Sequence, residues 1–184
     1  ETLAGVLAGL ADPALRDRKF AIRWHGELGA PLSETFTFFL LSDADTLVTI
    51  GADGSVLNRH RKLIPTNPER MVWGQGDASG LRVVDTAFAR LGGLICWENY
   101  MPLARYTLYA EGVQIYVAST WDNGEAWVSS MRHIAAEGRC WVIGSGCALN
   151  SRDIPESFPS RQAVFTDPDT WINSGDSVVV APTG

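Results

Sequence analysis

The sequence predicts an α/β fold, and two observations support this prediction. From residue 93 onward, short apolar runs of strand length alternate with two segments that have helical periodicity. Strand, helix, strand, helix and strand in this order is typical of an α/β layer architecture. At 184 residues, of which 46% are hydrophobic and 20% charged, the chain is long enough to bury a sizeable core. We therefore expect one domain over residues 1–184.

The expected strands are short apolar runs bounded by turn residues. An Asp-Gly pair at 53–54 predicts a tight turn between two of them. Strands are expected at residues 36–41, 46–50, 55–59, 81–85, 93–96, 113–118, 140–144 and 178–181. Residues 62–77 are rich in Pro, Gly and Asn, and residues 150–176 are long and polar, so both segments are expected to be loops.

Two helices are expected between the later strands. Residues 101–111 are followed by Gly112, a residue that is typical of helix C-termini. In residues 124–137 the apolar side chains recur at helical spacing, namely Trp127, Met131, Ile134 and Ala135. Residues 3–15 are rich in Ala and Leu, but two Gly and one Pro interrupt them, so only a weak third helix is expected there.

Composition and charge exclude several classes of partner. The net charge is −6 and no basic tract is present, which argues against binding to nucleic acid or an anionic membrane. No apolar run approaches the roughly 18–20 residues that span a bilayer. An odd number of cysteines at uneven spacing (Cys96, Cys140 and Cys147) argues against a disulfide framework and for a reducing compartment, so we expect a cytoplasmic protein.

Metal and cofactor chemistry are not expected either. The three histidines, His25, His60 and His133, are far apart in sequence and form no cluster with the cysteines. The glycines at 74 and 76 do not form a phosphate loop, because no Lys-Ser or Lys-Thr pair follows them. We therefore expect no cofactor and no metal.

Cys96 is the candidate nucleophile. It ends a run of small and apolar residues, and a polar turn with a helix-compatible segment follows it. A thiol at the C-terminal end of a buried strand and near a helix N-terminus is well placed to act as a thiolate. A second block at residues 60–70 offers Lys62 and Glu69 in a Pro-rich loop. A cysteine, a lysine and a carboxylate suit hydrolysis through a covalent thioester-type intermediate.

These motifs resemble the nitrilase branch of the carbon–nitrogen hydrolase superfamily. The matching text is HRKLxPTxxER at 60–70, WGxGD at 73–77, ICWENYMPL at 95–103, YAxGxQIY at 109–116 and SMxHIA at 130–135. The resemblance extends from about residue 46 to residue 184. It implies a partial form of the family's four-layer α-β-β-α sandwich. It also implies that a cysteine attacks a nitrile or amide carbon, that ammonia leaves, and that water then hydrolyses the acyl-enzyme.

The resemblance assigns roles to three catalytic candidates. Cys96 is expected to be the nucleophile. Lys62 is expected to promote the thiolate and to stabilise charge on the attacked nitrogen or the oxyanion. Glu69 is expected to lie near the site, where it orients Lys62 or shuttles a proton. Glu98, two residues after Cys96, is interpreted as a carboxylate of a turn or helix N-terminus rather than as an acid or base.

Three aromatic residues are candidates for substrate binding. Trp97 and Tyr100 could line a substrate pocket, although structural packing explains them equally well. Trp121 and Asp122 follow the strand at 113–118, at the sheet edge where ligands bind in α/β folds, so a pocket role is plausible there too. Cys140 and Cys147 are interpreted as core residues, with Cys147 opening toward the long polar segment.

One part of the family pattern is missing. The family's general base is a glutamate in a Phe-Pro-Glu context, well upstream of the Lys motif. Only 61 residues precede Lys62, and Glu1, Glu27 and Glu34 lack that context. We therefore expect a shortened nitrilase that is slow or inactive as written, since loss of a general base typically costs about 10²–10⁴-fold in rate.

Three function hypotheses follow. The first is hydrolysis of an organic nitrile to its carboxylic acid and ammonia through a thioimidate and a thioester. The second is a relative that acts on cyanide or on an amide. The third is a truncated, catalytically impaired fold that only assembles with partners.

Assembly is expected to involve the two predicted helices. Residues 101–111 and 124–137 resemble the helices through which nitrilases associate, and the second carries Trp127, Met131 and His133. We therefore expect a homo-oligomer, at least a dimer. His133 is interpreted as a hydrogen-bonded core or interface residue rather than a catalytic one.

Overall fold

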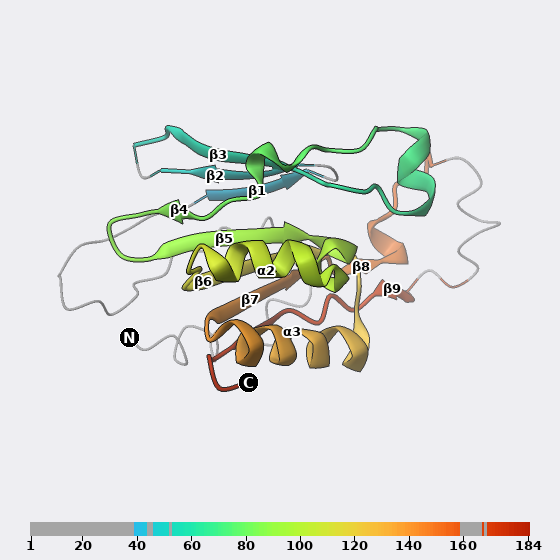
Figure 1. The fold of residues 1–184 in the computed structure, drawn as a ribbon. Coiled ribbons are helices and arrows are strands. Elements are labelled where there is room, and N and C mark those ends of the chain that lie inside the picture. Colours follow the sequence, from blue (N-terminus) through green and yellow to red (C-terminus); the bar gives the residue numbers. More distant parts are fainter. Residues whose placement is uncertain (1–38, 44–45, 52, 159–166, 168) are drawn as a thin grey trace. The chain divides into compact units, whose positions relative to one another are not determined.

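The computed structural model describes residues 39–43, 46–51, 53–158, 167 and 169–184 (Figure 1). The chain divides into two compact units. One comprises residues up to Leu41 together with Val48–Arg59, and the other comprises Ser42–Leu47 together with His60–Gly184. The expectation of one domain over the whole chain stays a prediction. The weak helix expected at 3–15 lies outside the described residues.

A three-stranded sheet lies near the start of the described chain. Its strands are β1 (Phe39–Asp43), β2 (Thr46–Ile50) and β3 (Val56–Arg61), in that order across the sheet. The predicted Asp-Gly turn precedes β3, and the Asp53 carboxylate accepts hydrogen bonds from the amide and the hydroxyl of Ser55 at 2.9 and 2.7 Å. Those two bonds explain why the chain reverses there, because an Asp side chain can replace a backbone acceptor in a turn.

A five-stranded mixed sheet carries most of the core. Its strands, in spatial order, are β10 (Val178–Val180), β7 (Trp141–Gly146), β6 (Ile115–Thr120), β5 (Arg90–Ile95) and β4 (Val84–Asp85). The three central strands are parallel, and the two edge strands run antiparallel to their neighbours. The ends of β5, β6 and β7 lie in register, so the residues that follow them meet at one sheet edge.

Glycine in β5 permits the close approach of β6. A Cβ on Gly93 would lie 2.3 Å from the carbonyl oxygen of Val117, a distance that a side chain cannot adopt. This contact explains the Gly-rich run before Cys96, since a larger residue would push the two parallel strands apart.

Helices α2 (Pro102–Ala110) and α3 (Gly124–Gly138) connect the parallel strands and pack beside the sheet (Figure 1). Pro102 stands in the first turn of α2, where its missing N–H costs nothing. The core contains fully buried side chains from both helices and from the sheet: Leu94, Leu108, Tyr116, Trp127, Met131 and Val142. Burial of such side chains stabilises the fold by about 1.5–3 kcal/mol each.

Short elements complete the described chain. Four 3₁₀ helices occur at Asn67–Met71 (η2), Ala78–Gly80 (η3), Cys96–Tyr100 (η4) and Ser151–Asp153 (η5). Strands β8 (Leu149–Asn150) and β9 (Trp171–Asn173) pair antiparallel as a separate two-stranded sheet.

Several sequence-based expectations need correction. The strand expected at 81–85 is only Val84–Asp85, and it is an edge strand. The segments expected to be loops contain η2 in the first case and η5 and β9 in the second, because local capping and pairing order them. His133 is not a core residue, since 64% of its side chain is exposed. Cys147 is exposed, whereas Cys140 is buried as expected.

Candidate active site

Cys96 lies at a sharp bend between a strand and a short helix. It follows β5 directly and is the first residue of η4, with a φ of 53° in the left-handed region. This conformation is unfavourable for a residue with a Cβ, and it persists only where the surroundings hold it. Asn99 supplies part of that support, because its amide nitrogen donates to the Cys96 carbonyl oxygen at 2.7 Å. The Asn99 amide oxygen in turn accepts a hydrogen bond from the Tyr116 hydroxyl at 2.8 Å.

Lys62 and Glu69 form a tight ion pair. The Lys62 ammonium lies 2.6 Å from the Glu69 carboxylate, and the Lys62 side chain is fully buried. The Thr66 amide donates to the same carboxylate oxygen at 2.5 Å, which fixes Glu69 at the start of η2. A buried ammonium is costly unless a carboxylate and hydrogen bonds compensate it. This arrangement can therefore hold Lys62 charged and in one orientation.

Gly76 closes the loop behind Lys62. Its amide donates to the Lys62 carbonyl oxygen at 2.8 Å. A Cβ at Gly76 would lie 2.5 Å from the Arg61 carbonyl oxygen and 2.6 Å from that of Lys62. The second glycine of the WGxGD motif is therefore required by packing, whereas nothing lies within 4 Å of a Cβ at Gly74.

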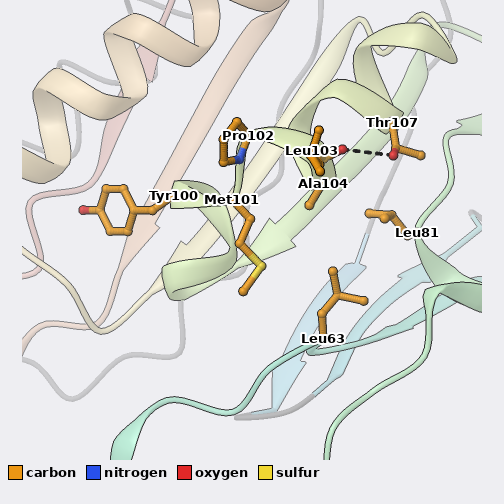
Figure 2. A pocket seen from close by; sticks show the side chains of 8 residues that line it. All are labelled: Leu63, Leu81, Tyr100, Met101, Pro102, Leu103, Ala104 and Thr107. Atoms are coloured by element: carbon orange, nitrogen blue, oxygen red, sulfur yellow. Dashed lines mark hydrogen bonds between the residues drawn. The ribbon is translucent and has the colours of Figure 1, made fainter.

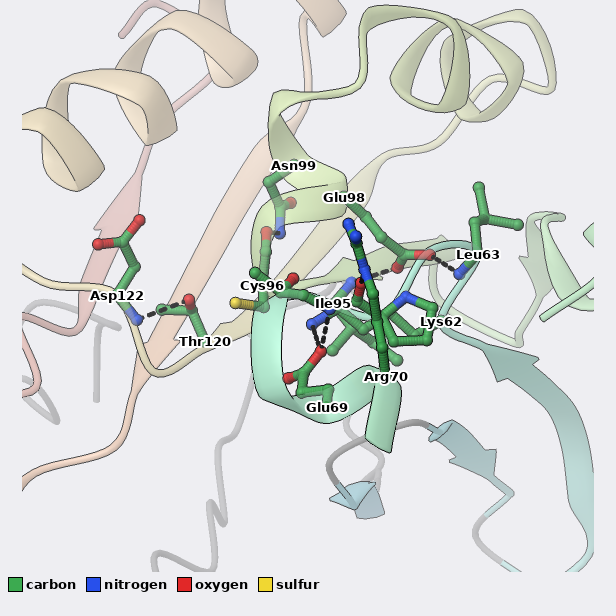
Figure 3. Close-up of polar contacts among 12 residues, drawn as sticks. Lys62, Leu63, Glu69, Arg70, Ile95, Cys96, Glu98, Asn99, Thr120 and Asp122 are labelled. Carbon is green, nitrogen blue, oxygen red and sulfur yellow. Dashed lines mark hydrogen bonds and ion pairs between the residues drawn. The ribbon is translucent and has the colours of Figure 1, made fainter. Parts of the chain in front are cut away.

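Glu98 is buried and faces away from the Cys96 sulfur. Figure 3 places the Cys96 sulfur on the side of the bend toward Thr120, and the Glu98 carboxylate on the other side, toward Leu63. The carboxylate accepts hydrogen bonds from the amides of Ile95 and Leu63 and from the ring of His60. The expectation of a turn carboxylate was incomplete, because Glu98 also contacts chain segments far away in sequence.

The three aromatic candidates are all substantially exposed. Trp97 is 55% exposed, Trp121 51% and Tyr100 38%. The rings of Trp97 and Tyr100 meet edge to face with centroids 5.7 Å apart. The structure thus brings Trp97 and Tyr100 together, and it places Trp121 directly after β6 at the sheet edge that also carries Cys96.

Tyr100 also contacts the Trp121–Asp122 loop. Its hydroxyl donates to the Asp122 carboxylate at 2.9 Å, and the Asp122 amide donates to the Thr120 hydroxyl at 2.8 Å. Partial burial, followed by the hydrogen bond to Asp122, raises the pKa of Tyr100 to about 12. The phenol therefore stays protonated and acts as a donor at neutral pH.

An apolar hollow of about 510 Å³ lies next to this region (Figure 2). It is lined by Leu63, Leu81, Tyr100, Met101, Pro102, Leu103, Ala104 and Thr107. Neither Cys96 nor Lys62 contributes to its wall. The hollow belongs to the surface around α2 and is not the cavity in which chemistry at Cys96 would occur.

The described residues support no other reactive centre. Burial raises the pKa of Cys140 to about 11, so this thiol is inert core packing. In the described part of the chain, no three His, Cys, Asp or Glu side chains are grouped to hold a metal ion. Within the same ranges, no helix has the length and apolarity needed to cross a membrane.

Two residues of this site were missed by sequence reasoning. His60 and Asn99 both hold the backbone around the candidate residues, through Glu98 and through the Cys96 carbonyl. The two-residue spacing of His60 and Lys62 was the available signal for His60, because residues i and i+2 of an extended chain share a face, and both side chains prove to be buried. Glu1, Glu27 and Glu34, the candidates for a general base, lie outside the described residues.

The assignments of Cys96, Lys62 and Glu69 as catalytic residues stay predictions, as do the substrate-binding assignments of Trp97, Tyr100 and Trp121. The geometry groups a cysteine at a strained bend and a fixed lysine–glutamate pair in one compact unit. It also places the aromatic candidates at the sheet edge beyond the nucleophile.

Comparisons with known proteins identify relatives of nearly the whole chain. An aliphatic nitrilase of Sinorhizobium fredii is 38% identical over 184 residues, covering 91% of this chain and 59% of the relative. Nitrilase 1 of Arabidopsis thaliana is 40% identical over 185 residues, covering 97% of this chain and 49% of the relative. The chain thus spans about half the length of the curated relatives that it matches.

The fold comparison finds a similar architecture. A carbon–nitrogen hydrolase of Helicobacter pylori superposes with a TM-score of 0.58 at 22% identity, covering 75% of this chain and 50% of that structure. At this identity the likeness concerns the fold, and it confirms the predicted α/β fold of the carbon–nitrogen hydrolase type. Residues 41–184 match the carbon–nitrogen hydrolase family as a whole. Because this match covers most of the sequence, the chain belongs to the carbon–nitrogen hydrolase family.

Proposed function

We propose that this chain is a nitrilase-type hydrolase that converts an organic nitrile to its carboxylic acid and ammonia. The observation that carries the proposal is the set of three groups formed by Cys96, in a strained bend directly after β5, and by Lys62, which follows β3 and is ion-paired to Glu69. Relatives that are named nitrilases and share about 38–40% identity support the choice of nitriles within the family.

The proposed reaction begins with attack of the Cys96 thiolate on the nitrile carbon. A carbon–sulfur bond forms, one carbon–nitrogen π bond breaks, and the nitrogen takes a proton to give a thioimidate. The Lys62 ammonium is the group assigned to stabilise charge on that nitrogen. Glu69 holds Lys62 in one orientation through the 2.6 Å ion pair.

Two molecules of water complete the turnover. The first adds to the thioimidate carbon, and the tetrahedral intermediate expels ammonia to leave a thioester. The second water cleaves the thioester, which releases the carboxylic acid and regenerates the thiol. The sum is one nitrile plus two waters to one acid plus one ammonia, and no cofactor is consumed.

The aromatic residues are proposed to contact the organic part of the nitrile. Trp97 and Tyr100 present a paired edge-to-face surface, and Trp121 lies after the adjacent parallel strand. Large, exposed rings of this kind suit an apolar substituent. Tyr100 adds a protonated hydroxyl, which Asp122 orients.

The experiment that tests the proposal is ammonia release from a panel of aliphatic and aromatic nitriles, with the matching amides and cyanide in parallel. We expect slow release of ammonia and acid from at least one nitrile, since the base motif is missing, and no release from the Cys96→Ala variant. Turnover of amides alone would replace this proposal with an amidase function. A folded chain that releases no ammonia from any compound would leave only a non-catalytic, assembling role.

Assembly is proposed to place a second copy against α2. On this helix Leu103 is 81% exposed and Tyr106 66% exposed, and the apolar hollow adjoins them. Trp127 and Met131 on α3, which were expected to support the interface, do not do so, because both side chains are fully buried in the core of the same chain. Exposed apolar surface on α2 is therefore the better support for an oligomer.

A reducing compartment, such as the cytoplasm, is proposed as the site of action. All three cysteines are free thiols, and Cys147 is exposed. The proposed chemistry requires Cys96 as a thiolate, which oxidation would remove.

A further inference from the structure

The position of Glu98 suggests a role that the sequence did not indicate. The residue follows the nucleophile by two positions, and its side chain is 0% exposed. Both carboxylate oxygens are occupied by donors from three parts of the chain. One oxygen accepts from the Leu63 amide at 2.5 Å, and the other accepts from the Ile95 amide at 2.8 Å.

His60 is the third donor to this carboxylate. Its ring nitrogen Nε2 lies 3.1 and 3.0 Å from the two oxygens of Glu98, and the His60 side chain is 1% exposed. A buried carboxylate needs this number of donors, because an unpaired charge in the core is costly. The three donors therefore fix the Glu98 carboxylate at one place.

The two backbone donors are next to the two candidate catalytic residues. The Leu63 amide belongs to the peptide unit that joins Lys62 to Leu63, and Ile95 immediately precedes Cys96. One carboxylate thus bonds to the segment that presents the ammonium and to the segment that presents the thiol. The donors are 35 and 3 residues from Glu98 in sequence, so this contact is a tertiary link between the two segments.

A role for Glu98 as acid or base does not fit this geometry. Its oxygens are filled, its side chain is inaccessible, and Figure 3 shows it on the side of the bend opposite to the Cys96 sulfur. We infer that Glu98, held by His60, is a positioning residue that sets the Lys62 ammonium relative to the Cys96 thiol. This inference rests on the proposed function, since it concerns the same pair of reacting groups.

The test uses the full chain in a Cys147→Ser background. Cys147 is exposed and Cys140 is buried, so this background leaves Cys96 as the thiol that an alkylating reagent reaches. Two readouts are followed: the rate of alkylation of Cys96 by iodoacetamide, and kcat and KM for the nitrile that the parent hydrolyses fastest. Circular dichroism and thermal unfolding establish that each variant is folded.

Glu98→Gln is the principal variant. The amide keeps one acceptor oxygen but turns an NH₂ group toward a backbone N–H, so one of the two segments is released. We expect kcat to fall about 100-fold with KM within about threefold, because a displacement near 1 Å is enough for a loss of that size. The alkylation rate should fall toward that of Lys62→Ala.

Glu111→Gln is the matched control. The Glu111 carboxylate also accepts a hydrogen bond from a backbone amide, that of Val83 at 2.6 Å, but it lies at the end of α2. The control should lower thermal stability without changing kcat or the alkylation rate. Equal effects of the two substitutions on Cys96, or a folded Glu98→Gln variant within threefold of the parent in both readouts, would overturn the inference.

His60 provides a second route if Glu98→Gln does not fold. His60→Ala should lower both rates about tenfold, and His60→Gln should restore most of the loss because its amide can again donate to Glu98. Where Glu98→Gln does fold, adding His60→Ala to it should cause no further loss, as expected of residues that act as a unit. Parent-like rates in His60→Ala would overturn the inference.

The two readouts separate this inference from the proposed function. Absence of nitrile turnover in the parent chain would contradict the proposed function. The comparison of alkylation rates among the parent, Glu98→Gln and Glu111→Gln variants would still decide whether Glu98 positions the two groups.

Discussion

Cys96 combines a strained backbone with several fixed neighbours. Its φ of 53° costs about 1–3 kcal/mol for a residue with a side chain. Asn99 bonds to its carbonyl oxygen, and Glu98 bonds to the amide of the residue before it. The strain is therefore offset by hydrogen bonds that would be lost if the bend relaxed. The thiol is presented at the sheet edge as a consequence of this local structure.

Replacement of the nucleophile should separate chemistry from folding. Cys96→Ala removes the sulfur that the covalent intermediate requires, while alanine fits the same half-buried space. We expect no detectable ammonia release and a thermal unfolding midpoint within a few degrees of the parent. Residual turnover above a few per cent of the parent would contradict the assignment of Cys96.

Lys62 should be intolerant of substitution in two ways. Lys62→Ala should cost about 3 kcal/mol or more in transition-state stabilisation, measured as the change in kcat/KM. Lys62→Arg should not rescue the activity, because a planar guanidinium does not fit the fully buried position at 2.6 Å from Glu69. An active Arg variant would mean that positive charge alone is needed.

Sequence patterns predicted most of the helices and strands, but not all of them and not every length. The order β5, α2, β6, α3, β7 and the final strand β10 were predicted, because period-2 and period-3.6 patterns report local burial directly. The short strands β8 and β9 were not predicted. The length of β4 was not, since an edge strand with one partner leaves a weak pattern. The Glu98 contacts were missed for a different reason. They join His60, Leu63 and Ile95, and partners that are 35 or 38 residues apart are set by the tertiary fold.

The loop before η3 offers a test with a built-in control. Gly76→Ala should destabilise the fold by about 1–3 kcal/mol and reduce turnover, because the new methyl group overlaps the backbone on both sides of the Arg61–Lys62 peptide. Gly74→Ala, two residues earlier, meets open space and should leave both quantities near the parent values. Chemical unfolding and initial rates measure the two effects, and equal behaviour of the variants would contradict this packing argument.

The contact between α2 and α3 should respond to acid. Burial raises the pKa of Glu137, but hydrogen bonds from Tyr109 and Arg105 outweigh it and lower the pKa below the ordinary 4.5. A lowered pKa in the folded state stabilises the fold above the ordinary pKa, and this contribution is lost as the pH falls through the folded value. Urea unfolding between pH 6 and about pH 3 should show a weaker acid dependence for Glu137→Gln than for the parent. Identical pH dependences of the unfolding free energy for the parent and Glu137→Gln would mean that the Glu137 contacts have no net effect on stability.

At the scale of the whole molecule, the family match places the chain among larger relatives. Residues 41–184 carry the match, and the chain spans about half the length of the nitrilases it resembles. Exposed apolar residues gather on α2, whereas the apolar residues of α3 that face the sheet are buried. Leaving such an apolar surface exposed to water is unfavourable for a monomer, so a contact with a second copy is expected here.

Sedimentation should therefore detect at least a dimer rather than a 20.0 kDa monomer. Leu103→Glu should shift the population toward monomer, because it places a charge in the proposed contact. Val56→Glu changes a similarly apolar exposed side chain on β3 and should leave the oligomer intact. A parent chain that sediments only as a monomer would contradict the assembly proposal.

Asn173 connects two segments that are distant in sequence. This buried amide donates to the Trp121 carbonyl oxygen and accepts from the Asn123 side chain at 3.0 Å, while Asp176 accepts from the Gly124 amide at 2.6 Å. Under the proposed role of Trp121 in substrate binding, residues 173–176 would influence substrate preference, because they hold the loop that carries Trp121. In libraries that vary only the loop around Trp121, the hydrogen bonds with Asn173 and Asp176 would still hold that loop in its present conformation. Varying both segments together would let the loop adopt new conformations without altering Cys96.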